Sequence, residues 1–146
     1  MSIQEKENEI IETFEMYDDW MGKYEHLIEI GKSLPLIEEK YKTDDYIVKG
    51  CQSKVWLNAS MENSNVIFKA DSDAIITKGL VALLISVLSN HTPDEILNAD
   101  LKFIDTIGLK EHLSSTRSNG LVSMIKLMKT YALGFRVTEM NRSRES

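Results

Sequence analysis

The stretch that decides the fold is KVWLNASMENSNVIFKA, residues 54–70. From Val55 to Met61 apolar side chains alternate with residues of the opposite face, which is the period of a half-buried strand. The polar run Glu62–Asn65 has the composition of a tight turn. The apolar run Val66–Ala70 then supplies a second strand. These residues therefore predict an antiparallel hairpin over 54–70.

The segments on either side of the hairpin complete the predicted sheet and its central helix. Tyr46–Val48 is short and apolar, so we expect it to add a third strand on the other side of a turn that contains Cys51. The segment Ala74–Leu88 is apolar nearly all round, as expected of a buried central helix. Asp71 or Ser72 is expected to cap the start of that helix.

The remaining segments are mostly helical in pattern. Thr92, Pro93 and Glu95 form a capping box with proline at the first helical position, and predict a short helix to about Asn98. The other helices are expected over 3–17, 19–32, 101–108 and from near Arg117 to Gly134, with a loop over 36–45. This order predicts an α+β fold in which helices cover one face of a three-stranded antiparallel sheet. We expect a single domain over 1–136 and a frayed polar tail over 137–146.

The composition excludes several classes of function. The chain has 146 residues, is 42% hydrophobic and carries a formal net charge of −6. An acidic balance argues against nucleic acid and anionic lipid as partners, because both need a basic face. No apolar run approaches the roughly 20 residues that span a bilayer. The polar N-terminal residues do not resemble a targeting peptide, so we expect a cytoplasmic protein.

The cysteine and histidine content narrows the possible sites. Cys51 is the only cysteine, which excludes an internal disulfide and cysteine-rich zinc or iron–sulfur sites. The three histidines, His26, His91 and His112, form no short ligand motif. The sequence also contains no Gly-rich phosphate loop of the common types. We therefore expect no resident metal or cofactor.

The residues around Cys51 leave two interpretations open. A lone cysteine is often a small buried hydrophobe. Here, however, loop-forming residues surround the thiol, and Lys49 and Lys54 bracket it. Nearby cations favour the thiolate form and would make the thiol reactive.

A hydrolase that uses Cys51 as nucleophile is a further possibility. It requires a base within hydrogen-bond reach of the thiol. His112 is the best candidate for that base, although no pattern in the sequence indicates that the two side chains meet.

Four blocks of sequence resemble the SufE family of sulfur-acceptor proteins over about residues 10–133. The blocks lie in the family's order and spacing, and they are Trp20 to Pro35, Val48 to Trp56, Asp71 to Leu80, and Leu113 to Leu121. Two positions depart from the family pattern. Ala70 stands where glycine is expected, and Ser115 stands where proline is frequent. These departures concern turn geometry and do not involve the thiol.

The resemblance implies a fold and a role. Members have a small curved antiparallel sheet with helices on one face, similar to the IscU-type scaffold proteins. They accept sulfur from a pyridoxal-phosphate cysteine desulfurase, here SufS- or CsdA-like, stimulate it, and pass the sulfur to a SufBCD-like cluster scaffold complex. They bind no pyridoxal cofactor themselves and are carriers rather than enzymes. Cys51 is then the residue that carries the persulfide.

The residues near Cys51 suggest how a sulfur carrier of this kind would work. Gly50 suggests a loop that flips Cys51 out of an apolar pocket, for which Val55, Trp56 and Leu57 are the candidate walls. The residues expected to support the loop or contact the partner are Gly50, Gln52, Ser53, Lys54, Asp73 and Arg117. Arg117 is expected to pair with Asp73 or to grip the desulfurase. A cluster scaffold and a cysteine hydrolase are the alternatives, and a single cysteine makes the scaffold difficult to build.

Overall fold

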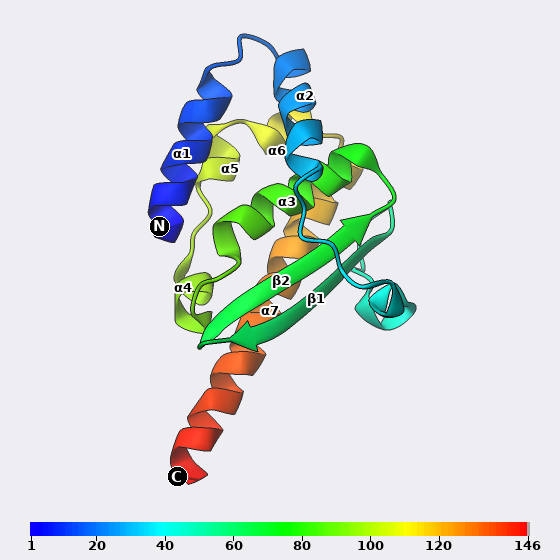
Figure 1. The fold of residues 1–146 in the computed structure, drawn as a ribbon. Helices are drawn as coiled ribbons and strands as arrows, with labels where there is room; N and C mark the ends of the chain where they lie inside the picture. The colour runs from blue at the N-terminus through cyan, green and yellow to red at the C-terminus, as the bar shows by residue number, and fades with distance from the viewer. Residues whose placement is uncertain (146) are drawn as a thin grey trace.

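Within the described residues, the two strands of the predicted hairpin make up the sheet. The structure is a computed structural model that describes residues 1–145. Strand β1, Val55–Glu62, pairs antiparallel with β2, Asn65–Ser72, as Figure 1 shows. Asn63 and Ser64 at the tip have φ angles of 50° and 69°, as a type I′ turn requires at both central positions. The predicted hairpin and its turn are therefore confirmed.

The predicted third strand is wrong. Within the described residues the sheet has two strands, and Ile47 makes only an isolated bridge to Trp56. A 3-10 turn over Asp44–Tyr46 comes directly before Ile47, and the Cys51 loop begins two residues after it. The 3-10 turn and the Cys51 loop therefore leave only Ile47 in position to pair with β1. On the other edge of the hairpin, Leu36 makes one parallel bridge to Ala70, so the segment from Leu36 to Ile47 borders both edges of the hairpin.

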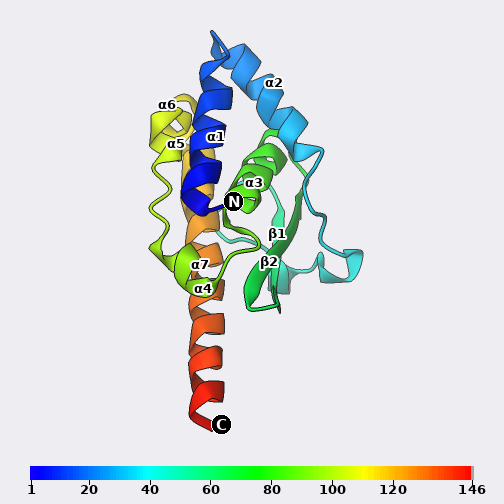
Figure 2. The same ribbon diagram turned by 60° about the vertical axis from the view of Figure 1, so that its left-hand side comes forward.

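Helices cover one face of the hairpin, so the α+β class is confirmed. Helix α3, Ile75–Leu88, packs on β2 and the long helix α7, Ser115–Glu145, packs on β1, and Figure 2 shows both on the same side of the sheet. The inward-facing side chains of the strands, among them Leu57 and Phe68, are fully buried there. The helices are α1 Ile3–Glu15, α2 Trp20–Gly31, α3 Ile75–Leu88, α4 Pro93–Asn98, α5 Phe103–Thr106, α6 Leu109–His112 and α7 Ser115–Glu145. A further 3-10 turn covers Glu39–Tyr41.

Helix α3 is the buried centre of the molecule, as its apolar composition predicts. It crosses α2 so closely that a Cβ atom at Gly79 would overlap the backbone carbonyl of Leu27. A larger residue at position 79 would push the two helices apart. The close crossing holds the first turn of α3 in place, and that turn forms part of the site described below.

Helix α7 does not end at Gly134, so that prediction is wrong. The helix continues to Glu145, and its last turns project beyond the rest of the protein (Figure 1). Glycine inside a helix costs only about 1 kcal/mol relative to alanine and does not by itself end the helix. Arg136 helps to hold this part, with Nε 3.1 Å from Oδ1 of Asp94. Residues 137–145, expected to fray, are thus helical, while residue 146 lies outside the described residues.

The segment 101–108 forms a shorter helix than predicted. Leu101 has a positive φ of 56° and Gly108 a φ of 76°, so the helical part is confined to Phe103–Thr106. Across the described residues, none of the helices combines the length and the apolar character that crossing a membrane requires.

Candidate functional site

The Cys51 loop, residues 49–54, is closed at its base by one backbone hydrogen bond. The Val48 N–H donates to the Val55 carbonyl over 2.8 Å. Gly50 has a φ of 92°, in the region that favours glycine. A Cβ atom on Gly50 would also lie 2.5 Å from Oγ of Ser123 on α7. The loop therefore needs glycine at this position both for its backbone conformation and for its close approach to α7.

Asp73 holds the far end of the loop. The Lys54 N–H donates to Oδ1 of Asp73 over 3.0 Å, and the Asp73 N–H donates to the Lys54 carbonyl over 3.2 Å. This reciprocal pair joins the end of the loop to the segment just before α3. Two residues predicted from the sequence, Lys54 and Asp73, are therefore brought together, with the backbone of Lys54 making the contacts.

The thiol of Cys51 lies half-buried between the loop and two helices. Its Sγ donates to the Gly120 carbonyl of α7 over 3.6 Å, and a Cβ atom at Gly120 would lie only 3.2 Å from the sulfur. Beside the thiol is a cavity of about 80 Å³. Its walls come from the loop, α3 and α7, namely Cys51, Gln52, Ser53, Thr77, Leu80, Thr116, Arg117, Gly120 and Met124.

The surroundings of Cys51 favour the neutral thiol. Burial raises the pKa of Cys51 above its ordinary value of 9.0. The prediction that Lys49 and Lys54 favour the thiolate is therefore wrong for this conformation, since both lysines are exposed and desolvation of the sulfur dominates. The thiol is sheltered in this state and becomes a good nucleophile only when it meets water or another charge.

The expected walls of the shelter are also wrong. Val55 and Leu57 point into the core of the protein, and Trp56 lies on the opposite face of the hairpin. There the Trp56 ring centroid is 5.8 Å from Nζ of Lys42. The apolar part of the Cys51 cavity comes instead from the helices.

His112 lies away from the thiol. Its ring stacks on Trp20 with the ring centroids 3.9 Å apart, and its Nδ1 is 3.1 Å from the Gly108 carbonyl. No histidine is among the described residues that line the Cys51 cavity. Within the described residues, His112 is therefore not placed to act as a base for Cys51.

Arg117 lies in the first turns of α7, where it lines the cavity and is exposed to solvent. Within the described part of the chain it forms no ion pair with Asp73. The expectation that Arg117 grips the desulfurase stays a prediction.

Neither Asp71 nor Ser72 caps α3 as predicted. The N-cap position is Ala74, which provides no side-chain cap. Ser72 Oγ instead accepts a hydrogen bond from the Ala74 N–H over 3.2 Å, in the turn before the helix. The first turn of α3 therefore begins without the usual oxygen partner.

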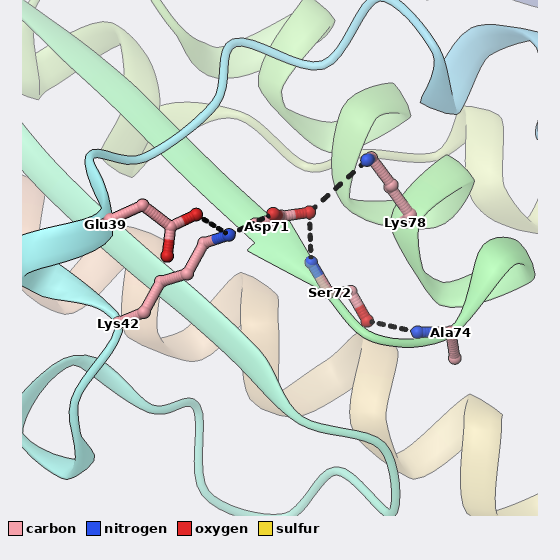
Figure 3. A network of polar contacts seen from close by, with 6 residues as sticks. All are labelled: Glu39, Lys42, Asp71, Ser72, Ala74 and Lys78. Atoms are coloured by element: carbon pink, nitrogen blue, oxygen red, sulfur yellow. Dashed lines mark hydrogen bonds and ion pairs between the residues drawn. The ribbon is translucent and has the colours of Figure 1, made fainter.

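Asp71 is the centre of a polar network on the outer side of the hairpin (Figure 3). Its carboxylate lies 2.7 Å from Nζ of Lys42 and 3.4 Å from Nζ of Lys78, and accepts the Ser72 N–H over 2.8 Å. Lys42 also pairs with Glu39 at 2.8 Å. Burial raises the pKa of Asp71, but these partners outweigh burial and hold that pKa below its ordinary value. The network ties the 3-10 segment to β2 and α3.

Sequence reasoning missed five residues that line the cavity, namely Thr77, Leu80, Thr116, Gly120 and Met124. Helical spacing provides a partial signal, because Thr116, Gly120 and Met124 follow one another at intervals of four and share one face of α7. Thr77 and Leu80 are likewise three residues apart on α3. The signal identifies a shared face but does not indicate that the thiol lies against it.

Fold and site together define a small α+β protein that presents its single thiol on a loop, against two helices. The family model described as "SufE: Fe-S metabolism associated domain" matches residues 8–132. The chain belongs to the SufE family, which is associated with iron–sulfur metabolism. The resemblance identified from the four sequence blocks is therefore confirmed.

Relatives from several organisms agree with this assignment. The chain is 41% identical over 133 residues to "SufE-like protein 1, chloroplastic/mitochondrial" of Arabidopsis thaliana, covering 90% of this chain but 36% of that protein. It is 41% identical over 132 residues to an uncharacterised SufE-like protein of Rhizobium meliloti, covering 87% and 94% of the two chains. A SufE-like protein of Synechocystis is 39% identical over 128 residues, with coverage of 88% and 80%.

A solved structure has the same fold. The solution structure of a hypothetical protein from Thermus thermophilus superimposes with a TM-score of 0.73 at 20% identity, covering 88% of this chain and 94% of the other. The plant relative's name assigns that protein to chloroplasts or mitochondria, so the cytoplasmic location of this chain stays a prediction.

Proposed function

We propose that this protein accepts a sulfur atom on Cys51 from a pyridoxal-phosphate cysteine desulfurase and carries it to the iron–sulfur cluster assembly machinery. The observation that supports this most strongly is the position of Cys51, half-buried on a loop beside a small cavity. Family membership and the family's association with iron–sulfur metabolism support the same role.

The proposed step is an exchange at sulfur. The donor carries a persulfide on its own cysteine. The Cys51 thiolate attacks the terminal sulfur, a new S–S bond forms on Cys51, and the donor's S–S bond breaks. The bonding pair leaves with the donor's sulfur as a thiolate. No net oxidation or reduction occurs, and one cysteine on the acceptor is sufficient.

The cavity can hold the transferred atom. A space of about 10–15 Å³ is enough for one water molecule, and a sulfur atom is somewhat larger. The cavity beside Cys51 measures about 80 Å³. A persulfide is attacked by free thiols and by oxidants, so a site that encloses the terminal sulfur protects it between donor and acceptor.

The sheltered thiol must be exposed for transfer. The raised pKa of Cys51 and its contact with Gly120 keep it unreactive at rest. We propose that the Cys51 loop swings outward on docking, with Gly50 providing the backbone freedom and the pair between Lys54 and Asp73 holding the other end. Hydrogen exchange over residues 48–54 tests this proposal. Docking of the desulfurase should change the protection there, and equal protection in both states would contradict the movement.

The partners follow from the proposed step. The donor is a SufS- or CsdA-like desulfurase, which the carrier stimulates by removing its persulfide, and the receiver is a SufBCD-like scaffold complex. The pyridoxal cofactor belongs to the donor, and the protein described here is a carrier rather than an enzyme. Residues 1–136 act as one domain in this scheme. The contact residues are Gly50, Gln52, Ser53, Lys54, Asp73 and Arg117, which lie in the Cys51 loop, before α3 and at the start of α7.

Desulfurase turnover in the presence of this protein tests the proposal. Wild-type protein should accelerate release of alanine from cysteine, because it clears the donor's persulfide. Cys51→Ser removes the nucleophile and should abolish the acceleration. The matched surface control is Lys102→Ala, at an exposed position in the segment before α5, which should behave as wild type. Equal acceleration by Cys51→Ser would contradict the proposal. Hydrolysis of esters or amides that depends on both Cys51 and His112 would favour the hydrolase instead.

A further inference from the structure

Thr77 is a buried polar residue in the wall of the Cys51 cavity. It lies in the first turn of α3, is 7% exposed, and lines the Cys51 cavity. In the part of the chain that the structure describes, the Thr77 hydroxyl forms no hydrogen bond with protein. Every side-chain oxygen that is completely enclosed there has a hydrogen-bond partner, so the Thr77 hydroxyl is not completely enclosed. The hydroxyl therefore borders the open space of the cavity rather than packed atoms.

Other threonines in the helices differ from Thr77. Thr13 and Thr130 each donate to the carbonyl four residues earlier, over 2.9 Å and 2.7 Å. Thr77 is only the third residue of α3, so the residue four positions earlier, Asp73, lies before the helix. The usual acceptor is not in place, and the Thr77 hydroxyl remains able to donate to a ligand.

The electrostatics of the α3 N-terminus favour an anion. The N-cap residue of α3, Ala74, provides no side-chain cap, and the first turn of the helix has no acidic residue. The nearest upstream carboxylates are engaged, Asp71 by Lys42 and Lys78, and Asp73 by the Lys54 N–H. The partial positive charge of the helix start is therefore not neutralised by a cap.

We propose that the Thr77 hydroxyl donates a hydrogen bond to the terminal sulfur of the Cys51 persulfide and so retains it in the cavity. The terminal sulfur of a persulfide is an anionic hydrogen-bond acceptor near neutral pH. The Thr77 hydroxyl faces the cavity as a donor and can form a hydrogen bond to it. Arg117 adds positive charge from α7, and Leu80 and Met124 limit the access of water. This inference rests on the proposed function, and it assigns Thr77 to retention of the sulfur rather than to its uptake.

Loss of sulfur from the loaded protein tests the inference. Each variant is loaded with a cysteine desulfurase and cysteine, separated from the enzyme, and challenged with glutathione while intact mass is followed. Thr77→Val, which replaces the hydroxyl by a methyl group, should load but lose its sulfur about tenfold faster, as expected for a lost hydrogen bond to a charged acceptor. Thr77→Ser keeps the hydroxyl and should retain sulfur as wild type does. Thr13→Val is the matched control on α1 and should also behave as wild type.

Stability measurements separate binding from packing. Without the persulfide, Thr77→Val removes a hydroxyl that borders the open cavity and makes no hydrogen bond to protein within the described residues, so the unloaded variant should unfold with a free energy close to that of wild type. Retention by Thr77→Val at the wild-type rate would overturn the role of Thr77, and so would equally fast loss from Thr77→Ser. If Thr77→Val does not fold, Thr77→Ala takes its place. Faster loss of sulfur from Thr77→Ala than from Thr77→Ser would support the role of the hydroxyl, and equal rates of loss would overturn it. Failure of wild type to gain sulfur would instead refute the proposed function.

Discussion

The substitution Gly120→Ala probes the packing of the thiol against α7. A Cβ atom at this position would lie 3.2 Å from Sγ of Cys51 and 3.7 Å from its Cα and Cβ atoms. The contact with sulfur is tighter than nine in ten real Cβ contacts, so Cys51 must shift by a few tenths of an ångström. The shift weakens the 3.6 Å contact of Sγ with the Gly120 carbonyl and moves the thiol toward water.

Two opposing terms set the stability of this variant. Alanine is more favourable than glycine inside a helix by about 1 kcal/mol. An over-packed contact costs about 1–3 kcal/mol, and the lower end applies because the thiol is the end of a side chain on a loop. The free energy of unfolding should therefore change little or fall by up to about 2 kcal/mol. The matched control is Gly134→Ala in the same helix, where nothing lies within 4 Å of an added Cβ atom.

Urea unfolding and alkylation of Cys51 with iodoacetamide provide the two readouts. Gly134→Ala should gain stability and leave the thiol unchanged, so the difference in unfolding free energy between the variants isolates the cost of the contact. In Gly120→Ala the pKa of Cys51 should fall toward 9.0, because burial is what raises it. Alkylation at neutral pH should accelerate accordingly. Equal gains in stability with an unchanged Cys51 pKa would refute the packing described here.

Three further predictions follow from the same structure. In wild type the pH midpoint for alkylation of Cys51 should lie above 9.0, and a midpoint at or below 9.0 would contradict the burial. The folded state holds the thiol proton more tightly than the unfolded state does. The free energy of unfolding should therefore decline, relative to Cys51→Ser, only as pH rises from 9.0 through that midpoint. Gly50→Ala should slow sulfur acceptance and lower the free energy of unfolding by about 1–3 kcal/mol. Adding Ser123→Gly removes the clash but not the unfavourable φ, so it should recover only part of the lost stability. Full recovery of stability would exclude backbone strain. Asp71→Asn should lower the free energy of unfolding at pH 7 by about 1–3 kcal/mol through loss of the ion pair with Lys42. That loss should disappear as pH falls below 3.8 through the depressed pKa of Asp71, and a loss that persists at low pH would argue against an ionic origin.

The hairpin could be predicted because its signals are local. Alternation along the strands and the polar turn at Asn63 and Ser64 depend on residues that are neighbours in sequence. The capping box at Thr92 is equally local, and the side chain of Thr92 accepts the Glu95 N–H as predicted. Elements defined over a few adjacent residues therefore follow from the sequence.

Elements that depend on tertiary context could not be predicted in this way. The apolar run Tyr46–Val48 has the composition of a strand, but the preceding 3-10 turn leaves only Ile47 in position to pair. Asp71 has the composition of a helix cap, but two lysines from other segments compete for its carboxylate. In both cases the deciding contacts come from residues far away in sequence or from the path of the chain.

The site shows the same limit. The sequence and its resemblance identified Cys51 and its loop, and both lie where a cavity borders two helices. The effect of Lys49 and Lys54 on the thiol was judged from sequence proximity, whereas burial decides the direction of its pKa. The helical spacing of Thr77 and Leu80 indicates a shared face of α3, but it does not indicate that the Thr77 hydroxyl is left without its usual acceptor, because that follows from the position at which α3 begins.

The central claim is that Cys51 carries the transferred sulfur, and the intact mass of the protein tests it most directly. Since Cys51 is the only cysteine of the chain, a persulfide on this protein reports that one atom. After incubation with a cysteine desulfurase and cysteine, wild-type protein should gain the mass of one sulfur atom, which dithiothreitol should remove, and Cys51→Ser should gain nothing. A wild-type mass that stays unchanged while the desulfurase is turning over would contradict the account.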